Sequence, residues 1–532
     1  MMCRLVYASL IAAFSCMSAA TAFAQTDPGV RGGLQNTGGG LQAQGIPIPH
    51  PPVISNNPTT GAAISGNEFK SFFEGIQRAG QLESTCDTCS MVTPGSPAVK
   101  NPISKLRELD PIFPQFTTNS NGLGARHNAD QCFGCHFQPT LGGSGGFLVP
   151  NPVDLAKGGP AAARAPENPQ FDLIPHRFGK QNIVPSFQQQ YGPIREVRFI
   201  YQVDPNGNII LENGKPIIDG GVHQLWVVRG IQTDPTIPQC ALTQPDFEKQ
   251  VQQNNVAFRI PLQMTGLGLI DSIQDREILG RQTATASARA ALGIAGRPNR
   301  SGNDGTITRF GWKAQNKSIT MFAGEAYNVE MGITNELFPQ SKEEDVNCNG
   351  PEKPEPNDVT RMDNGDDSND SFHNPLHILA DWMQFQLLMR FTDAPQPDPK
   401  PSASAVQGKT VFNTTGCALC HTPTMQTAPT LDSAVLQNRP ANLFSDLLLH
   451  DMGDDLADGI SQGLAGPREF RTTPLWGVGQ RIFFLHDGRT NDLLKAIRAH
   501  SSNGSEANQV IGKFEALSVS DKQSILDFLR SL

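Results

Sequence analysis

The sequence has few charged residues and, beyond its first 24 residues, no long apolar run. Asp, Glu, Lys and Arg make up 17% of its 532 residues, and the formal net charge is −9. This balance does not indicate the basic surface that binds nucleic acid or an anionic membrane. No later stretch approaches the roughly 18 apolar residues of a spanning helix. We therefore expect no nucleic-acid partner and no integral membrane segment after cleavage of the leader.

The first 24 residues are typical of a secretory signal peptide. A basic residue, Arg4, precedes an apolar stretch from Leu5 to Ala20, and the segment ends in the small-x-small pattern of Ala22 and Ala24. We expect cleavage after Ala24 and export of the mature chain, and we assign it to the periplasm.

Cysteine is scarce, and its distribution is informative. There are 10 cysteines, and four of them form two copies of Cys-x-x-Cys-His, at 132–136 and 417–421. This motif attaches c-type haem: the two thiols add to the porphyrin vinyl groups and the histidine binds the iron. A zinc site would need more paired ligands than the one remaining Cys-x-x-Cys supplies. The sequence predicts two covalently bound haem c groups, held by Cys132, Cys135, Cys417 and Cys420, with His136 and His421 as iron ligands.

Four other cysteines remain after removal of the leader: Cys86, Cys89, Cys240 and Cys348. An even number in an oxidising compartment favours two disulfides. We prefer the pairs 86–89 and 240–348, although the sequence does not fix the pairing. The alternative is a reactive dithiol at 86 and 89, which would make the protein a thiol or disulfide oxidoreductase.

The chain before the second motif is long and rich in loops. Residues 25–65 contain much Gly, Pro, Asn and Gln and predict a flexible or surface-draped arm. Residues 66–395 form the expected N-terminal haem domain, with helices over 67–82 and 377–390. Alternating residues within 195–230, with a turn at 204–208, predict a β-hairpin insertion in this domain.

Residues 396–532 have the plan of a small cytochrome c domain. A helix over 407–412 leads into the second Cys-x-x-Cys-His motif, and a terminal helix over 520–532 places Ile525, Phe528 and Leu532 on one apolar side. The fold class predicted is mainly α, with two cytochrome c-like haem domains, the N-terminal one enlarged by loops and the hairpin.

The sequence resembles the di-haem oxidoreductase family, which is related to bacterial di-haem cytochrome c peroxidases and to the di-haem enzyme that matures methylamine dehydrogenase. Six stretches carry the resemblance within residues 66–532: 122–136, 305–315, 325–333, 448–459, 470–481 and 484–489. In the better understood relatives the N-terminal haem meets peroxide and the C-terminal haem passes electrons. The resemblance implies that Trp312 is the tryptophan between the haems. It also implies that Glu330 moves protons beside the peroxidatic iron, with Glu325 as runner-up because the spacing differs by about two residues.

The resemblance also bears on the second axial ligands of the two irons. Relatives carry a distal Met or Tyr after the His-Asp-Gly turn, and the matching position is His500, with Met452 as the alternative. A second histidine would lower the potential of the C-terminal haem relative to a His/Met haem. For the first haem the candidates are His127, His176 and His223. None has supporting spacing, and an iron without such a ligand is open to peroxide. His486 is expected to orient its turn.

These features predict an exported di-haem oxidoreductase that reduces a peroxide, or uses it to oxidise a substrate, at the His136 haem. Electrons would come from a small redox protein, a cytochrome or a cupredoxin, through the His421 haem. The alternative is a pure electron-transfer cytochrome with both irons six-coordinate. Relatives also hold a calcium ion between the haems, but the sequence indicates no ligands for it: the loop that starts at Asp345 has Pro356 where a calcium loop needs Glu.

Overall fold

The structure is a computed structural model, and every structural statement below refers to the part of the chain that it describes. That part comprises residues 25–29, 51–80, 83–84, 120–121, 126–129, 131–136, 138, 141–145, 168, 170, 182–189, 192–227, 243–333, 335–338 and 381–532. None of the helices within these ranges is long and apolar enough to cross a membrane.

The described chain is mainly helical, and its strands form only two-stranded sheets. The α-helices are α1 (Gly66–Gly80), α5 (Phe247–Gln252), α6 (Leu267–Asp271), α7 (Asp275–Ala284), α8 (Ala286–Ala290), α9 (Ile319–Met331), α10 (Asp381–Phe391), α11 (Ala403–Thr415), α12 (Leu493–Arg498), α13 (Asn508–Ala516) and α14 (Val519–Ser531). Single 3-10 turns are η3 (Cys132–Gly134), η7 (Cys417–Leu419), η8 (Ala434–Leu436), η9 (Asp454–Leu456) and η10 (Val478–Gln480).

The strands are short and pair in twos. One pair is parallel, β1 (Glu83–Ser84) with β2 (Ser120–Asn121). The antiparallel pairs are β3 (Arg126–His127) with β7 (Trp226–Val227), β4 (Glu196–Phe199) with β8 (Val256–Arg259), β5 (Leu211–Glu212) with β6 (Lys215–Pro216), β9 (Asn299–Arg300) with β10 (Ile307–Thr308), β11 (Met425–Gln426) with β12 (Pro440–Ala441), and β13 (Leu449–Asp451) with β14 (Glu469–Arg471).

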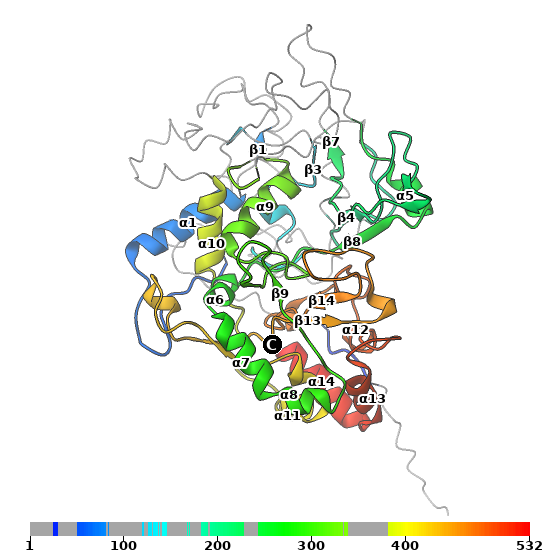
Figure 1. The fold of residues 1–532 in the computed structure, drawn as a ribbon. Helices are drawn as coiled ribbons and strands as arrows, with labels where there is room; N and C mark the ends of the chain where they lie inside the picture. Colours follow the sequence, from blue (N-terminus) through cyan, green and yellow to red (C-terminus); the bar gives the residue numbers. More distant parts are fainter. Residues whose placement is uncertain are drawn as a thin grey trace, which may run out of the picture.

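Helices α1, α9 and α10 gather around the first Cys-x-x-Cys-His motif (Figure 1). The helical spacing seen in the sequence of α1 places Phe72 and Ile76 on its buried face. The helices α1 and α10 approach closely, because a Cβ atom at Gly75 would lie 2.6 Å from Cβ of Leu388. The helices predicted over 67–82 and 377–390 are thus confirmed within the described residues.

Helices α11 and α14 pack against each other at the opposite end of the molecule (Figure 1). Both begin at a serine cap, Ser402 and Ser518, whose hydroxyl accepts a hydrogen bond from a backbone N–H of the first turn. A Cβ atom at Gly408 would lie 1.8 Å from the carbonyl oxygen of Ser524, so only glycine permits this approach. The two helices predicted for this segment are confirmed.

One core runs through both halves of the chain. The largest cluster of buried apolar residues includes Phe72 and Phe385 from the N-terminal part, and Met425, Leu448 and Trp476 from the C-terminal part. The expected division at residues 395 and 396 therefore falls between elements that share a core. The boundary between the two predicted domains therefore stays a prediction.

The expected arm differs from the structure where it is described. Ile54 is fully buried and its N–H donates to the carbonyl oxygen of Phe391, while the Asn57 side chain donates to two carbonyls of the C-terminal half. Near the start, the carboxylate of Asp27 accepts two hydrogen bonds from the guanidinium of Arg530 in α14. These residues are held by long-range hydrogen bonds, which does not agree with the flexible form of the predicted arm, because polar and proline-rich sequence can still be fixed by remote partners.

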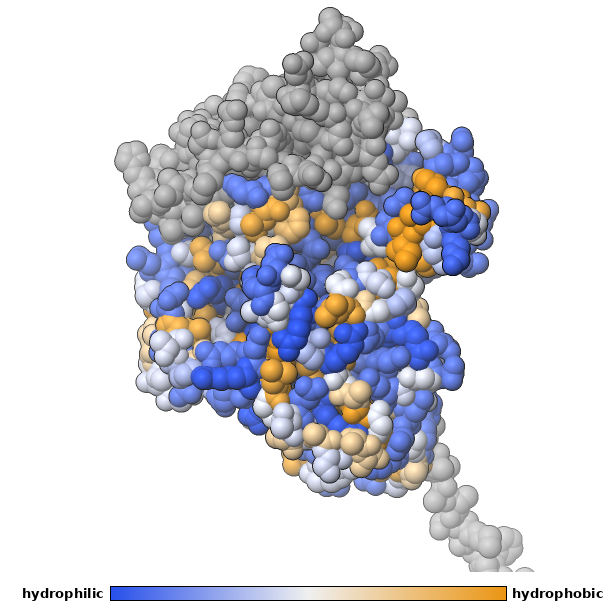
Figure 2. All heavy atoms as spheres, viewed as in Figure 1, coloured by the Kyte–Doolittle hydropathy of each residue, from blue (hydrophilic) through white to orange (hydrophobic). Residues whose placement is uncertain are grey.

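The predicted hairpin insertion is present, but its first strand, β4, pairs mainly with a strand outside the predicted segment. The turn at 204–208 forms, and Val203 pairs with Ile209 beyond it. However, β4 pairs along its length with β8, so this strand belongs to a larger β-rich unit beside α5. The side chains of Leu211 and Ile218 are 59% and 66% exposed on the insertion, and apolar colour gathers there in Figure 2.

Candidate haem sites

Both Cys-x-x-Cys-His motifs fold into the same local structure. Each begins with a 3-10 turn, η3 or η7, that starts at the first cysteine. The N–H of His136 donates to the carbonyl of Cys132 at 3.0 Å, and the N–H of His421 donates to that of Cys417 at 2.9 Å. Two segments far apart in the sequence therefore present the same three side chains on the same turn.

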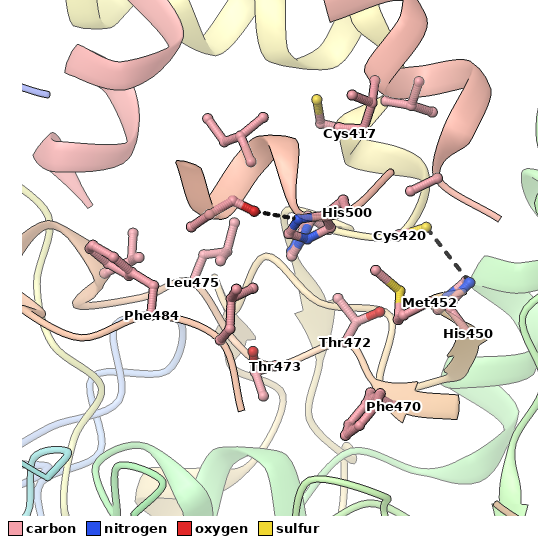
Figure 3. Close-up of a pocket in the computed structure, with 18 of the residues that line it drawn as sticks. Cys417, Cys420, His450, Met452, Phe470, Thr472, Thr473, Leu475, Phe484 and His500 are labelled. Carbon is pink, nitrogen blue, oxygen red and sulfur yellow. Dashed lines mark hydrogen bonds between the residues drawn. The ribbon is translucent and has the colours of Figure 1, made fainter. Parts of the chain in front are cut away.

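The second motif borders a large apolar cavity. Its volume, measured as the space open to the centre of a water molecule, is about 220 Å³, whereas one water needs roughly 10–15 Å³ on this measure. Cys417, Cys420 and His421 line it, and aliphatic and aromatic side chains from η10, α12, α13 and α14 close it (Figure 3). A cavity of this size and character suits a flat, largely apolar macrocycle.

His421 and His500 face each other across this cavity. Their ring centroids are 6.4 Å apart. Metal–nitrogen bonds of about 2.0 Å from two imidazoles on opposite sides of one ion place the centroids about 6 Å apart. The Nδ1 atom of His421 bonds to the carbonyl of Phe444 at 3.1 Å, and that of His500 bonds to the carbonyl of Ala496 at 2.8 Å. Such bonds fix the tautomer in which Nε2 is the free ligand atom, so the donor set fits a haem iron with two histidines.

Burial keeps both of these imidazoles neutral, as a metal ligand must be. Desolvation, with a smaller effect from His500, lowers the pKa of His421 to about 4. Desolvation likewise lowers the pKa of His500, while its backbone hydrogen bonds oppose the shift.

Met452, the alternative ligand, lines the same cavity in a different environment. Its side chain packs with Trp312 and Phe470, and Figure 3 shows it beside His450. The opposed pair of rings is formed by His500, so the geometry favours His500 over Met452 as the ligand opposite His421.

The first motif has the same donor arrangement around its histidine. The Nδ1 atom of His136 lies 3.2 Å from the carbonyl of Gly143, on the loop that folds back after the motif. Desolvation lowers the pKa of His136 to about 4. The described space near this loop is a small cavity of about 20 Å³, lined in part by Leu262. The ligand chemistry thus fits a haem, and much of the chain that follows the motif lies outside the described residues.

The candidate distal histidines of the first site have other surroundings. His223 stacks on Phe199 at 3.8 Å between ring centroids, and its Nε2 bonds to Asp219 at 3.0 Å. His127 is fully buried on β3, opposite Trp226 of β7. His176, like Cys86, Cys89, Cys240 and Cys348, lies outside the described residues, so the proposed disulfides and the dithiol stay predictions.

Trp312 lies between the two motifs. Its indole N–H donates to the carbonyl of Ile260 at 2.9 Å, and its ring lines the His421 cavity. It also packs in one cluster with Leu262, whose backbone hydrogen bonds to His136. His486 packs on the cavity side, 6.3 Å from the Trp312 ring and stacked on Phe470. Trp312 is therefore one of the side chains at which the surroundings of the two motifs meet.

Glu330 lies at the end of α9 in a half-buried acid pair. It hydrogen bonds to Glu196, and its carboxylate accepts a bond from the Asn128 amide at 2.8 Å. Desolvation and the charge of Glu196 raise the pKa of Glu330 well above its usual value. The guanidinium of Arg198, 2.5 Å from Glu196, helps to keep the pKa of Glu196 low. The pair therefore shares a proton, and Glu330 holds it.

Asn128 connects this acid pair to the first motif. Its N–H donates to the backbone carbonyl of Glu330 at 2.6 Å, and it stands four residues before Cys132 in the sequence. Glu325, the runner-up, instead hydrogen bonds to Asn316. The structure thus brings Glu330 to a partner beside the motif.

Sequence reasoning missed the charged groups that surround these residues. Glu196 and Arg198 belong to a strand read only as a hairpin. Lys313, fully buried next to Trp312, contacts Asp458 at 2.9 Å and lies over the Phe470 ring. Only Lys313 could have been noticed in the sequence, because it follows Trp312 directly within the stretch 305–315 that carries the family resemblance.

The described residues also test the zinc alternative. They hold no cluster of three or more His, Cys, Asp or Glu side chains placed to bind a metal ion. Within the described ranges, neither Cys-x-x-Cys-His motif therefore has the additional ligands that a zinc site would need.

Two equivalent Cys-x-x-Cys-His turns, an apolar cavity and opposed imidazoles are the features of a di-haem protein. The comparison with protein families agrees. The family model for "Di-haem oxidoreductase, putative peroxidase" matches residues 239–532, more than half of the chain, and the protein belongs to this family. The family implies haem cofactors and an oxidoreductase activity in a general sense. The match includes Trp312, Glu330, His421 and His500 but not the first motif. No curated protein is significantly similar to the chain.

Proposed function

We propose that the protein is an exported di-haem c-type oxidoreductase that reduces a peroxide, or uses it to oxidise a small molecule, at its N-terminal haem. Cys132 and Cys135 would hold that haem covalently, and Cys417 and Cys420 would hold the second. When bound, the haem iron supplies peroxide binding and electron transfer, which protein side chains do not provide. The contribution of this chain is ligation, proton placement and a path between the two sites.

The observation that carries the proposal is the position of Trp312. Its ring forms part of the His421 cavity and belongs to a cluster against which Leu262 packs, and the backbone of Leu262 hydrogen bonds to His136. A pure carrier with two independent haems has no need of an aromatic side chain held rigidly between them. The hydrogen bond to Ile260 fixes the indole plane. We assign Trp312 as the electron relay.

Glu330 is suited to moving the protons that the reaction needs. Reduction of hydrogen peroxide to two waters takes up two electrons and two protons, and a group that gives up and regains a proton near the reacting oxygen accelerates it. The raised pKa of Glu330 favours its protonated form, and the guanidinium of Arg198 stabilises the charge that remains when the proton leaves. Asn128 holds the carboxyl beside the first motif.

The electrons would enter at the C-terminal haem from a small redox protein, a cytochrome or a cupredoxin, in the periplasm. Two histidine ligands, His421 and His500, make that iron a site for electron transfer rather than for substrate. The first site would then remain the place where a peroxide binds.

The test is peroxide turnover by the purified holoprotein. Haem content is first measured as the pyridine haemochrome, with two haems per chain expected, retained after acid–acetone extraction because they are covalently bound. Hydrogen peroxide consumption is then followed with a reduced small cytochrome c as donor. We expect E330Q to lose roughly 10²–10⁴-fold in rate.

E325Q is the matched control, because it removes a carboxylate from the same helix, and we expect its rate to stay close to that of the wild type. Two haems without turnover would identify an electron carrier and contradict the peroxidase proposal. Equal losses in E330Q and E325Q would remove the assignment of Glu330.

A further inference from the structure

Buried arginines are numerous in this chain, and most have an acidic partner. Eight arginine side chains are buried within the described residues. Six of them form ion pairs, with Glu196, Asp458, Asp446, Asp275, Asp393 and Asp27 as partners of Arg198, Arg259, Arg289, Arg309, Arg439 and Arg530. This is the expected arrangement, because an isolated buried charge is costly unless an opposite charge faces it.

Arg471 and Arg481 are the two exceptions. Each is more than nine-tenths buried, and no described carboxylate pairs with either. Arg471 donates through Nε to the carbonyl of Gly311, and Arg481 donates through one Nη to the hydroxyl of Ser144. One Nη of Arg471 and the Nε of Arg481 have no hydrogen-bond partner among the described residues. Burial lowers both pKa values to about 10, so both guanidinium groups stay charged at pH 7.

Their position is shared by the two sites. Both side chains line the large cavity of His421, and both also line the small cavity beside Leu262. Ser144, the partner of Arg481, lies on the loop that follows His136. The backbone N–H of Arg471 donates to the carbonyl of Trp312. The two positive charges are therefore held at the junction between the haem sites, next to the relay tryptophan.

We propose that Arg471 and Arg481 form a binding site for the carboxylates of the haem groups at this junction. The inference rests on the proposed function, because it requires haem at these cavities. A haem carries two carboxylates on one edge of an otherwise apolar ring, which matches two guanidinium groups without a carboxylate partner at the wall of an apolar cavity. Arginine is well suited to binding a carboxylate, and each side chain retains one buried N–H donor without a partner among the described residues.

The site would set the redox properties of the haems. A fixed positive charge favours the reduced iron, which carries one positive charge less, and so raises the midpoint potential. A guanidinium at hydrogen-bond distance also lowers the pKa of a carboxylate. The carboxylates then stay ionised through the neutral range, and reduction takes up few protons there. Arg471 and Arg481 are thus positioning and tuning residues rather than catalytic ones.

The experiment is a potentiometric titration of the holoprotein between pH 5 and pH 9, for the wild type, R471Q, R481Q and their lysine variants. We expect each glutamine variant to lower the midpoint potential of at least one haem and to make it fall more steeply with rising pH. The lysine variants should show smaller shifts, because they keep the charge. R468Q is the control: Arg468 lies near Arg471 in the sequence, is about one-third exposed, and pairs with Asp451 outside the cavity.

Haem content separates this inference from the proposed function. Fewer than two haems per chain in the wild type would contradict the function. Two haems, with potentials and pH dependence in R471Q and R481Q equal to those in R468Q, would overturn the inference. A glutamine variant that loads no haem supports it if the lysine variant restores loading, and counts against it if lysine does not. A wild-type potential that changes with added formate would show that the arginines hold carboxylates from solution instead.

Discussion

Replacing Trp312 by phenylalanine tests how firmly the relay residue is held. The change removes the indole N–H and leaves the carbonyl of Ile260, now 2.9 Å from its donor, without a partner in a buried position. An unsatisfied buried group costs about 1–3 kcal/mol. The lost volume of roughly 40 Å³ adds about 1 kcal/mol at 24 cal/mol per Å³. We therefore expect W312F to lower the free energy of unfolding by about 2–4 kcal/mol.

Trp476 provides a matched control for this prediction. It is also buried, at 4% exposure, but its indole nitrogen has no hydrogen-bond partner among the described residues. The W476F variant loses the same volume together with an N–H that makes no hydrogen bond, and we expect a cost of no more than about 1 kcal/mol. Urea unfolding of both holoproteins, followed by far-UV circular dichroism, measures the difference. Equal destabilisation of the two variants would refute the argument that a hydrogen bond fixes Trp312.

Two further predictions concern buried charge. The pKa of Glu330 is raised by burial and by Glu196 above the usual value of 4.5. A raised native pKa stabilises the fold below the unfolded pKa, and this contribution is lost as the pH rises toward the native pKa. E330Q should therefore gain stability relative to the wild type as the pH rises above about 4.5, and a difference in thermal unfolding that stays constant with pH would contradict this. Asp27 accepts two hydrogen bonds from Arg530, with one more each from the N–H groups of Leu493 and Gly29. We expect D27A to lower the free energy of unfolding in urea by about 2–3 kcal/mol, after allowance for the partial exposure of Asp27. Q523A removes neighbouring hydrogen bonds without leaving a buried charge unpaired, and we expect it to lower the free energy of unfolding by less than about 1 kcal/mol.

The elements that the sequence predicted well are those governed by local spacing. A Cys-x-x-Cys-His motif is contained in five residues, and the helices α1, α11 and α14 follow from apolar positions on one face. The resemblance placed His500 at the relatives' distal-ligand position by its distance beyond the His-Asp-Gly turn; its ring centroid lies 6.4 Å from that of His421, and its role as an iron ligand stays a prediction.

The features that the sequence did not reveal depend on partners far away in the chain. The pKa of Glu330 is raised first by desolvation and then by the charge of Glu196, which lies on a strand distant in the sequence. Nothing near Ile54 or Asn57 indicates burial, because the groups that cover them come from α10 and from the segment around η8. The composition of a segment indicates its local conformational preference. It does not indicate these contacts, because they form only when elements distant in the sequence pack together.

The measurement that tests the central claim most directly is the EPR spectrum of the purified protein, fully oxidised and then half-reduced. The structure places His500 opposite His421, so we predict a low-spin signal of a haem with two histidine ligands, which H500A abolishes while Met452→Ala leaves it unchanged. We also predict a high-spin signal from the His136 haem, present at once or appearing on half-reduction. Two low-spin signals in both states would contradict the account, because neither iron would then offer a free position to a peroxide.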